Sequence, residues 1–152
     1  MKIPISVLVV IYKSNRDVLL IERADRKGFW QSVTGSLDAP DENLALAATR
    51  EVFEETGIQV DSLPVGALHD MHHHIEYEIY PEWRFRYAPG VTRNTEHWFS
   101  LQVPDEIHVQ LAPREHVAYQ WLPFEQAAKK CFSRSNGEAI MRLFSANQSR
   151  SE

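Results

Sequence analysis

The chain has 152 residues, of which 43% are hydrophobic and 24% are charged, a balance typical of one globular domain with a buried core. Its formal net charge of -5 argues against a protein that binds nucleic acid through the phosphates, because such proteins carry a basic surplus. The single cysteine, Cys131, excludes an intrachain disulfide, and nothing indicates an oxidising compartment.

The first predicted element is a hydrophobic strand near the N-terminus. Residues 5–12 form an apolar run that is too short to span a bilayer, and the polar residues 13–17 that follow contain no small-residue cleavage site. We therefore expect a buried strand, paired in a hairpin with a second strand over 18–22. A cytoplasmic location without a membrane partner is the default expectation.

The next elements lead to the most informative segment of the chain. We predict a strand over 29–34, a loop rich in Asp and Pro over 36–42, and a helix over 43–56. Gly57 follows this helix and favours its C-terminal cap.

The second half of the chain is predicted to contain strands and then helices. Strands are expected near 58–68, 74–80, 96–103 and 117–122, and helices over 123–130 and 136–144. Without strict alternation of strand and helix, this order predicts one α+β sandwich around a mixed sheet. We assign residues 1–145 to a single domain and residues 146–152 to a polar, frayed tail.

Three glutamates share one face of the predicted helix. Glu51 precedes Glu54 by three residues and Glu55 by four, so at about 100° per residue their carboxylates lie together. The face is continued by an apolar stripe consisting of Leu44, Ala47 and Ala48. Like charges this close repel one another, more strongly when partly buried. Arg50 can offset part of the charge, and a hard divalent cation such as Mg²⁺ can offset the rest.

The opposite side of this helix is also apolar. Leu46 and Phe53 project there, so we predict that the helix is covered on two sides. A solvated face that is acidic by chance is the alternative interpretation of the glutamates. Their place on an apolar stripe, after a loop bounded by glycine, favours the metal site.

The segment that contains this helix resembles the signature of the Nudix family, G-x5-E-x7-R-E-U-x-E-E-x-G-U, in which U is aliphatic. The matching residues are Gly35, Glu42, Arg50, Glu51, Val52, Glu54, Glu55, Gly57 and Ile58. Six residues instead of five separate Gly35 from Glu42, and we place the extra residue in the Asp38–Asp41 loop, where it leaves the helix in register. Because of this insertion, Glu42 is left out of the predicted metal ligands.

The resemblance implies the Nudix fold, an α/β/α sandwich with a mixed sheet, and Mg²⁺-dependent hydrolysis of a phosphoanhydride bond, with Mn²⁺ as a substitute. It implies that Glu51 and Glu55 are metal ligands, that Glu54 is a ligand or a base, and that Arg50 orients the cluster. Glu115 precedes a predicted strand and is implied to be a further metal ligand or the base that activates water. A plain surface glutamate is the alternative for Glu115.

Segments outside the signature resemble one bacterial branch of the family, which hydrolyses dihydroneopterin triphosphate to the monophosphate and pyrophosphate in folate biosynthesis. These segments are FWQSVTGS (29–36), RYAPGVTRNTE (86–96), EHVAY (115–119) and SN (135–136). The resemblance implies contacts with a small-molecule triphosphate from Lys2, Arg23, Thr34, Tyr77, Glu78, Ile79, Tyr80 and Ser133. The alternatives are a disordered Lys2 and tyrosines with only a sheet role.

Three other functions remain open from the sequence. The same chemistry on nucleoside triphosphates such as dATP is the nearest, because pterin and guanine present similar hydrogen-bonding edges. A non-catalytic Nudix-like nucleotide-binding module would not need all three glutamates of the helix. An acidic Ca²⁺-binding or scaffold domain is disfavoured by the absence of an EF-hand loop pattern. The sequence sets no oligomeric state.

Several other residue groups have structural interpretations that compete with a functional one. The four histidines His69, His72, His73 and His74 are expected on a solvated loop or strand end, because neighbours on a strand point to opposite faces and do not converge on zinc. The tryptophans Trp30, Trp83, Trp98 and Trp121 are expected mainly in the core. Phosphate binding and pairing with Glu76, Glu78 and Glu82 are both open for Arg84, Arg86 and Arg93.

Overall fold

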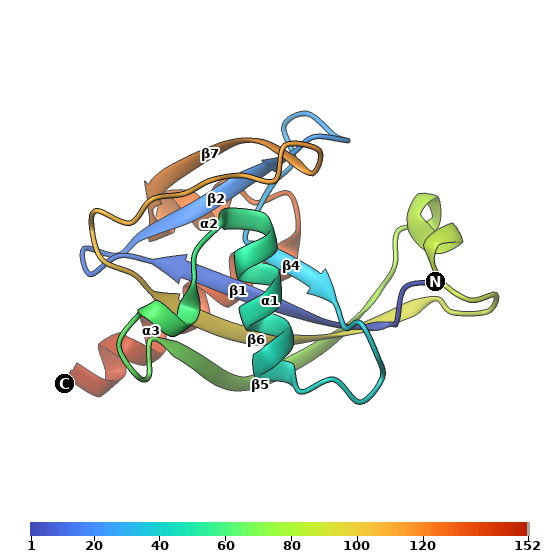
Figure 1. The fold of residues 1–152 in the computed structure, drawn as a ribbon, viewed down its shortest axis with the longest axis horizontal. Helices are drawn as coiled ribbons and strands as arrows, with labels where there is room; N and C mark the ends of the chain where they lie inside the picture. Colours follow the sequence, from blue (N-terminus) through green and yellow to red (C-terminus); the bar gives the residue numbers. More distant parts are fainter. Residues whose placement is uncertain (152) are drawn as a thin grey trace.

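The computed structural model describes the backbone of residues 1–151 and the side chains of residues 1–145. The described residues form one seven-stranded mixed sheet with the main path β3-β2-β1-β6-β5, while β4 pairs with β1 and β7 with β2 (Figure 1). The strands are β1 (Ile5–Tyr12), β2 (Asp17–Arg23), β3 (Trp30–Gln31), β4 (Val33–Ser36), β5 (Leu68–Glu78), β6 (Arg93–Gln102) and β7 (His116–Pro123). β1 and β6 run parallel, and the other pairs are antiparallel.

Helices cover both faces of this sheet. They are α1 (Leu44–Thr56), α2 (Phe124–Lys130) and α3 (Arg134–Ser151), with 3-10 helices η1 (Val60–Ser62) and η2 (Pro81–Arg86) between strands. Alternate residues of β1 point to opposite faces, so Val7 joins the core beneath α1, whereas Leu8 joins the core beneath α2 and α3. The predicted α+β sandwich around a mixed sheet is confirmed.

The partner of β1 changes along its length. Tyr12 pairs with Val18 of β2, whereas Ser6–Val9 pair with β4. This change brings β4 beside the first half of β1 and into contact with α1. The glycine at which the family signature begins, Gly35, therefore lies against the helix that carries the glutamates.

The boundaries of α1 follow from its capping residues. The Asn43 side chain accepts a hydrogen bond from the Leu46 amide at 3.2 Å, which satisfies one of the free donors of the first turn. Gly57 ends the helix in the left-handed conformation, with φ of 74°, which a residue without a side chain adopts at no steric cost. The predicted helix over 43–56 is confirmed to within its capping residue.

Three predicted strands differ from the observed ones. The single strand expected over 29–34 is two short strands, because β3 pairs with β2 whereas β4 pairs with β1 and continues to Ser36. The strand expected over 58–68 is wrong: η1 and a turn occupy most of that range, since Pro64 lacks an amide donor and Gly66 adopts a positive φ of 88°. The strand expected near 74–80 begins earlier, at Leu68. A register shift between Asp70 and His74 interrupts its pairing, which hid the strand from its sequence pattern.

The helices at the C-terminus also differ in extent. The helix predicted over 136–144 lies inside α3, which continues to Ser151, so the backbone is helical where a frayed tail was expected. The side chains of the predicted tail lie outside the described residues. Among the helices of the described residues, none combines the length and the hydropathy that a membrane span requires.

The prediction that α1 is covered on two sides is wrong. Leu46 is 65% exposed and Phe53 is 52% exposed. Only the face with Ala47, Ala48 and Val52 is buried against the sheet, because α1 forms the outer layer of the sandwich. The apolar character of the outer face therefore does not come from packing within the described chain.

Candidate active site

A cavity of about 1040 Å³ opens where α1, β4, η2 and the start of α3 approach one another. This volume is in the range of small-molecule sites. All the residues predicted for catalysis, metal binding and substrate binding line the cavity: Lys2, Arg23, Thr34, Arg50, Glu51, Glu54, Glu55, Tyr77, Glu78, Ile79, Tyr80, Glu115 and Ser133. Their chemical roles remain predictions, but their convergence is a property of the fold.

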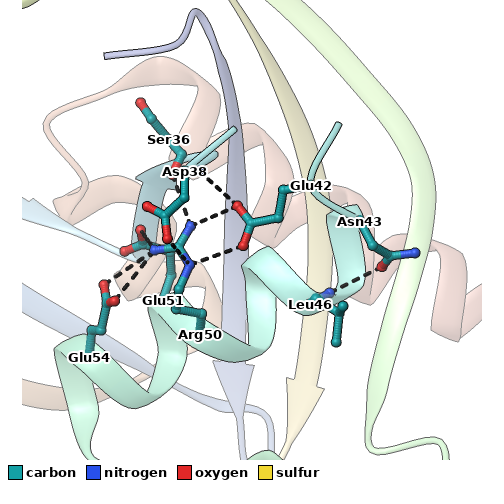
Figure 2. A network of polar contacts seen from close by, with 8 residues as sticks. All are labelled: Ser36, Asp38, Glu42, Asn43, Leu46, Arg50, Glu51 and Glu54. Carbon is teal, nitrogen blue, oxygen red and sulfur yellow. Dashed lines mark hydrogen bonds and ion pairs between the residues drawn. The ribbon is translucent and has the colours of Figure 1, made fainter. Parts of the chain in front are cut away.

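Arg50 is the centre of a polar network on α1 (Figure 2). Its Nη1 donates to Glu51 at 2.8 Å and, at 3.4 Å, to Glu54. Its Nη2 donates to Glu42 at 3.0 Å and to the Ser36 carbonyl at 3.2 Å. Hydrogen bonds to these carboxylates raise the pKa of Arg50, which keeps the guanidinium charged. The arginine thereby connects the loop before α1 to the glutamates of the helix.

Glu42 takes part in this network despite the extra residue that precedes it. Besides its contacts with Arg50, it accepts a hydrogen bond from the Asp38 amide at 2.8 Å. The hydrogen bond from Arg50 lowers the pKa of Glu42. The insertion is accommodated in the loop, and the residue at this signature position orients the arginine.

Glu55 lies at the base of the carboxylate cluster and is only 2% exposed. Neither of its oxygens has a hydrogen-bond partner of ordinary geometry among the described residues. Burial raises the pKa of Glu55 well above its usual range, and the neighbouring Glu51 and Glu115 carboxylates raise it further. His116 Nε2 lies 3.7 Å from Glu55 Oε1, but burial lowers the pKa of His116 to about 4, so a neutral ring offers no balancing charge.

Glu51 occupies a space that only a glycine on β4 can provide. It is 9% exposed, and burial raises the pKa of its carboxyl. A Cβ atom built on Gly35 would overlap with the Glu51 carboxylate. The missing side chain at Gly35 therefore lets the carboxylate of α1 lie directly against the backbone of β4.

These residues fit a hard divalent cation. The buried Glu55 carboxyl lacks a hydrogen-bond partner of ordinary geometry in the part of the chain that the structure describes and lies beside the Glu51 carboxyl, so a bound positive ion would stabilise both. Carboxylate oxygens are ligands that suit Mg²⁺. Within the described residues, no three side chains of the types His, Cys, Asp and Glu are already grouped for metal binding. Mg²⁺ commonly takes one or two carboxylates and completes its shell with water and substrate phosphates, which agrees with two inner glutamates at an open cavity.

The cavity is also lined by Lys2, Arg23 and Arg86, three cations close enough for their charges to interact, which we call the cationic end. The Lys2 amide donates to the Arg86 carbonyl at 2.8 Å, so Lys2 is fixed by the backbone and is not disordered. Burial, followed by the charges of Arg86 and Arg23, lowers the pKa of Lys2. Asp25 holds both arginines, at 2.7 Å from Arg23 and 3.6 Å from Arg86. A second anion with several oxygens, such as a triphosphate, would relieve the repulsion among these cations.

Aromatic side chains lie beside the cationic end. Trp83 contacts the Arg23 guanidinium, with 4.7 Å to the ring centre, and meets Tyr80 and Phe132 edge to face. Tyr77 Oη accepts a hydrogen bond from Asn94 Nδ2 at 3.1 Å. Together these residues provide apolar surface on which a flat ring can lie.

Several residues of this cavity were not predicted from the sequence, namely Asp25, Trp83, Asn94, Glu96 and His116, and Arg86, for which phosphate binding and ion pairing were both open, also lines it. Trp83 was expected mainly in the core and instead lines the cavity, whereas Trp98 is buried in the core as expected. Asn94 and Glu96 alternate along β6 within the RYAPGVTRNTE segment. Polar residues at every second position of a strand lie on one face, and this pattern was the signal that could have indicated a polar site on β6.

The remaining open groups have structural roles. Arg93 lies 4.0 Å from Glu76 and 3.8 Å from Glu78, which is the ion pairing expected as one of its two roles. Arg84 donates to the Ile79 carbonyl at 3.0 Å. The four histidines occupy β5 around its register shift, and the His73 ring packs against Trp98 in a tilted arrangement, with 4.5 Å between ring centres.

Comparison with known proteins agrees with this geometry. A family model described as the NUDIX domain matches residues 2–143. The dihydroneopterin triphosphate diphosphatase of Escherichia coli is 47% identical over 140 residues, which cover 91% of each chain. The enzyme of the same name from Haemophilus influenzae is 40% identical over 136 residues, covering 89% of this chain and 84% of the relative.

A solved structure gives the same result at the level of the fold. The E. coli dihydroneopterin triphosphate pyrophosphohydrolase superposes with a TM-score of 0.84 and 46% identity, covering 93% of this chain and 94% of that one. The resemblance of the signature, the narrower resemblance of the flanking segments and the predicted fold class are confirmed. The chain belongs to the NUDIX family.

Proposed function

We propose that this protein hydrolyses dihydroneopterin triphosphate to dihydroneopterin monophosphate and pyrophosphate, with Mg²⁺ as the metal. That it is a hydrolase of pyrophosphate bonds follows from its family and its relatives. The observation that carries the proposal is one cavity lined by groups of opposite charge. Glu51 and Glu55 line the same cavity as three cations, Lys2, Arg23 and Arg86. Neither oxygen of Glu55 has a hydrogen-bond partner of ordinary geometry in the described part of the chain.

The carboxylate end, as we call Glu51, Glu54 and Glu55 of α1, would hold the metal. Glu51 and Glu55 are the proposed ligands, and Arg50 orients Glu51 through its 2.8 Å contact. A bound Mg²⁺ would lower the pKa of the attacking water and draw charge from the leaving phosphates. Mn²⁺, which also prefers oxygen ligands, is the expected substitute.

The cationic end would hold the phosphates. Lys2, Arg23 and Arg86 can donate charge-assisted hydrogen bonds to phosphate oxygens, which fixes the chain of phosphates along the cavity. Thr34 and Ser133 add hydroxyl groups that can bind an oxygen of the phosphates or of the ring.

The remaining step is proton removal from water. Glu54 is 51% exposed at its side chain, and Glu115 is exposed on the loop before β7, so both can reach a water molecule at the mouth of the cavity. Water then adds across the anhydride bond between the first and second phosphates, with a hydroxyl on one phosphorus and a proton on the other product. No covalent intermediate with the enzyme is required.

The test is pyrophosphate release with Mg²⁺ from dihydroneopterin triphosphate and from the common ribo- and deoxyribonucleoside triphosphates at equal concentration. We expect a clear preference for the pterin. Equal or faster turnover of a nucleotide such as dATP would exclude the substrate assignment and retain the pyrophosphohydrolase. Release from none of them would favour a binding module.

A further inference from the structure

Glu96 is a buried carboxyl that the proposed chemistry does not use. It lies on β6 two residues after Asn94 and two before Trp98, so the three side chains share one face of the sheet. Glu96 is only 2% exposed. It nevertheless lines the cavity. Trp98 Nε1 donates to Glu96 Oε1 at 3.0 Å, which fixes the carboxyl group in place.

The surroundings of Glu96 leave part of its hydrogen-bonding capacity free. Burial raises its pKa, while hydrogen bonds from Trp98 and Ser135 favour the charged form. Within the described residues Glu96 forms no ion pair that would offset its burial. A carboxylate accepts about four hydrogen bonds, so Trp98 and Ser135 leave roughly two positions for other donors. A ligand in the cavity is the group that can supply them.

Asn94 adds a second acceptor beside Glu96. Its Nδ2 donates to Ser6 Oγ at 2.7 Å and to Tyr77 Oη at 3.1 Å, so both amide hydrogens are used. Its Oδ1 is buried without a hydrogen-bond partner. Tyr77 is close enough for Glu96 to raise the pKa of its hydroxyl, after the larger effect of burial. We call Asn94 and Glu96 the acceptor floor of the cavity.

An acceptor floor selects rings that present adjacent donors. The 2-amino-4-oxopyrimidine edge of a pterin has a ring N–H next to an amino group, and guanine has the same edge. Adenine instead places an acceptor ring nitrogen next to its amino group. A carboxylate can accept both donors of the first kind of edge in parallel, as it does from an arginine, whereas adenine offers it only one.

We propose that Glu96 is a specificity-determining residue, whose carboxylate accepts hydrogen bonds from the ring N–H and amino group of a 2-amino-4-oxopyrimidine, with Asn94 beside it. This inference rests on the proposed function and names the part of the substrate that the cavity distinguishes. The carboxylate end and cationic end act on phosphates common to all candidate substrates. Discrimination among rings then falls to the acceptor floor.

The experiment compares wild type, Glu96→Gln and the control Glu125→Gln, an exposed glutamate of α2 outside the cavity. For each protein, kcat/KM is measured with dihydroneopterin triphosphate, dGTP, dITP and dATP. Glutamine keeps the size of the side chain and replaces one acceptor with a donor. We expect kcat/KM for the pterin and for dGTP to fall about 10- to 100-fold, and that for dATP to change less than about threefold. Glu125→Gln should match wild type.

The substrate dITP is dGTP without the amino group, so comparing the two in wild type tests the contact with that amino group without any substitution in the protein. In wild type, dITP should be about tenfold worse than dGTP, and Glu96→Gln should abolish that difference. Equal rates for dITP and dGTP in wild type would overturn the inference, and so would an equal fall of all four rates in a variant with unchanged melting temperature. A wild type that prefers nucleotides to the pterin would instead refute the proposed function, and the dGTP-to-dITP ratio would still decide the role of Glu96.

Discussion

The carboxylate end and the cationic end of the cavity come from the sequence in different ways. The carboxylates of Glu51, Glu54 and Glu55 come from two turns of one helix, α1, and share a face because of helical geometry alone. The cationic end combines Lys2 from the N-terminus, Arg23 from β2 and Arg86 from η2. The carboxylate end therefore depends on one short segment of the chain, whereas the cationic end forms only when distant segments fold together.

The carboxylate end and the cationic end also differ in how their charge is balanced. The cations share Asp25, which lies near both Arg23 and Arg86. The charge of Lys2 acts on Glu55 through space, but neither oxygen of Glu55 has a hydrogen-bond partner of ordinary geometry among the described residues, and burial and the neighbouring carboxylates disfavour its charged form. We therefore expect the carboxylate end to depend on a bound cation, while the cationic end keeps its geometry without a ligand.

Removal of one carboxylate should have the largest effect. Glu51→Gln should lower kcat by about 10³-fold, because a proposed metal ligand is lost while the side-chain size is retained. Pyrophosphate release measures the rate, with Glu125→Gln as the matched control. Mg²⁺ should raise the melting temperature of wild type and of the control more than that of Glu51→Gln. Near-normal turnover of Glu51→Gln would show that the metal is held elsewhere.

Gly35 tests whether the carboxylate end needs contact between α1 and β4. Gly35→Ala places a Cβ atom where the Glu51 carboxylate lies, so Glu51 must move. We expect kcat to fall about 10²-fold and the Mg²⁺ concentration for half-maximal rate to rise. In the Glu51→Gln background the same substitution should have a much smaller effect on kcat, because both changes act on one side chain. Additive effects would mean that Gly35 acts through something other than Glu51.

Arg86 tests the cationic end. Arg86→Ala should raise KM for the triphosphate about tenfold with little change in kcat, because the lost charge-assisted hydrogen bond holds the phosphates in the bound substrate and the transition state alike. Arg142→Ala is the matched control, since Arg142 is an exposed arginine of α3 that does not line the cavity. A fall in kcat at unchanged KM would instead assign Arg86 to the reacting bond.

The same contrast explains what could be predicted from the sequence. The helix of the glutamates, its glycine cap and the sandwich architecture follow from local periodicity and turn chemistry, and they are confirmed. Trp83 and Arg86 were not assigned to the cavity, because their place depends on the packing of η2 against the N-terminus. The start of β5 at Leu68 was missed because a register shift in its pairing with β6 breaks the pattern on which the prediction of a strand depends.

The smallest effect is expected from a substitution on the outer face of α1. Such a substitution tests whether only the side of α1 that faces the cavity and the sheet contributes to activity and stability. Phe53 is half exposed, so Phe53→Ala should change the free energy of unfolding by less than about 1 kcal/mol and leave kcat unchanged. Phe99→Ala, at a buried position of β6, removes the same atoms from the core and should cost about 3–5 kcal/mol. Urea unfolding of both variants measures the difference. A cost for Phe53→Ala close to that of Phe99→Ala would mean that the outer face is covered in solution, and the original expectation of a helix buried on two sides would regain support.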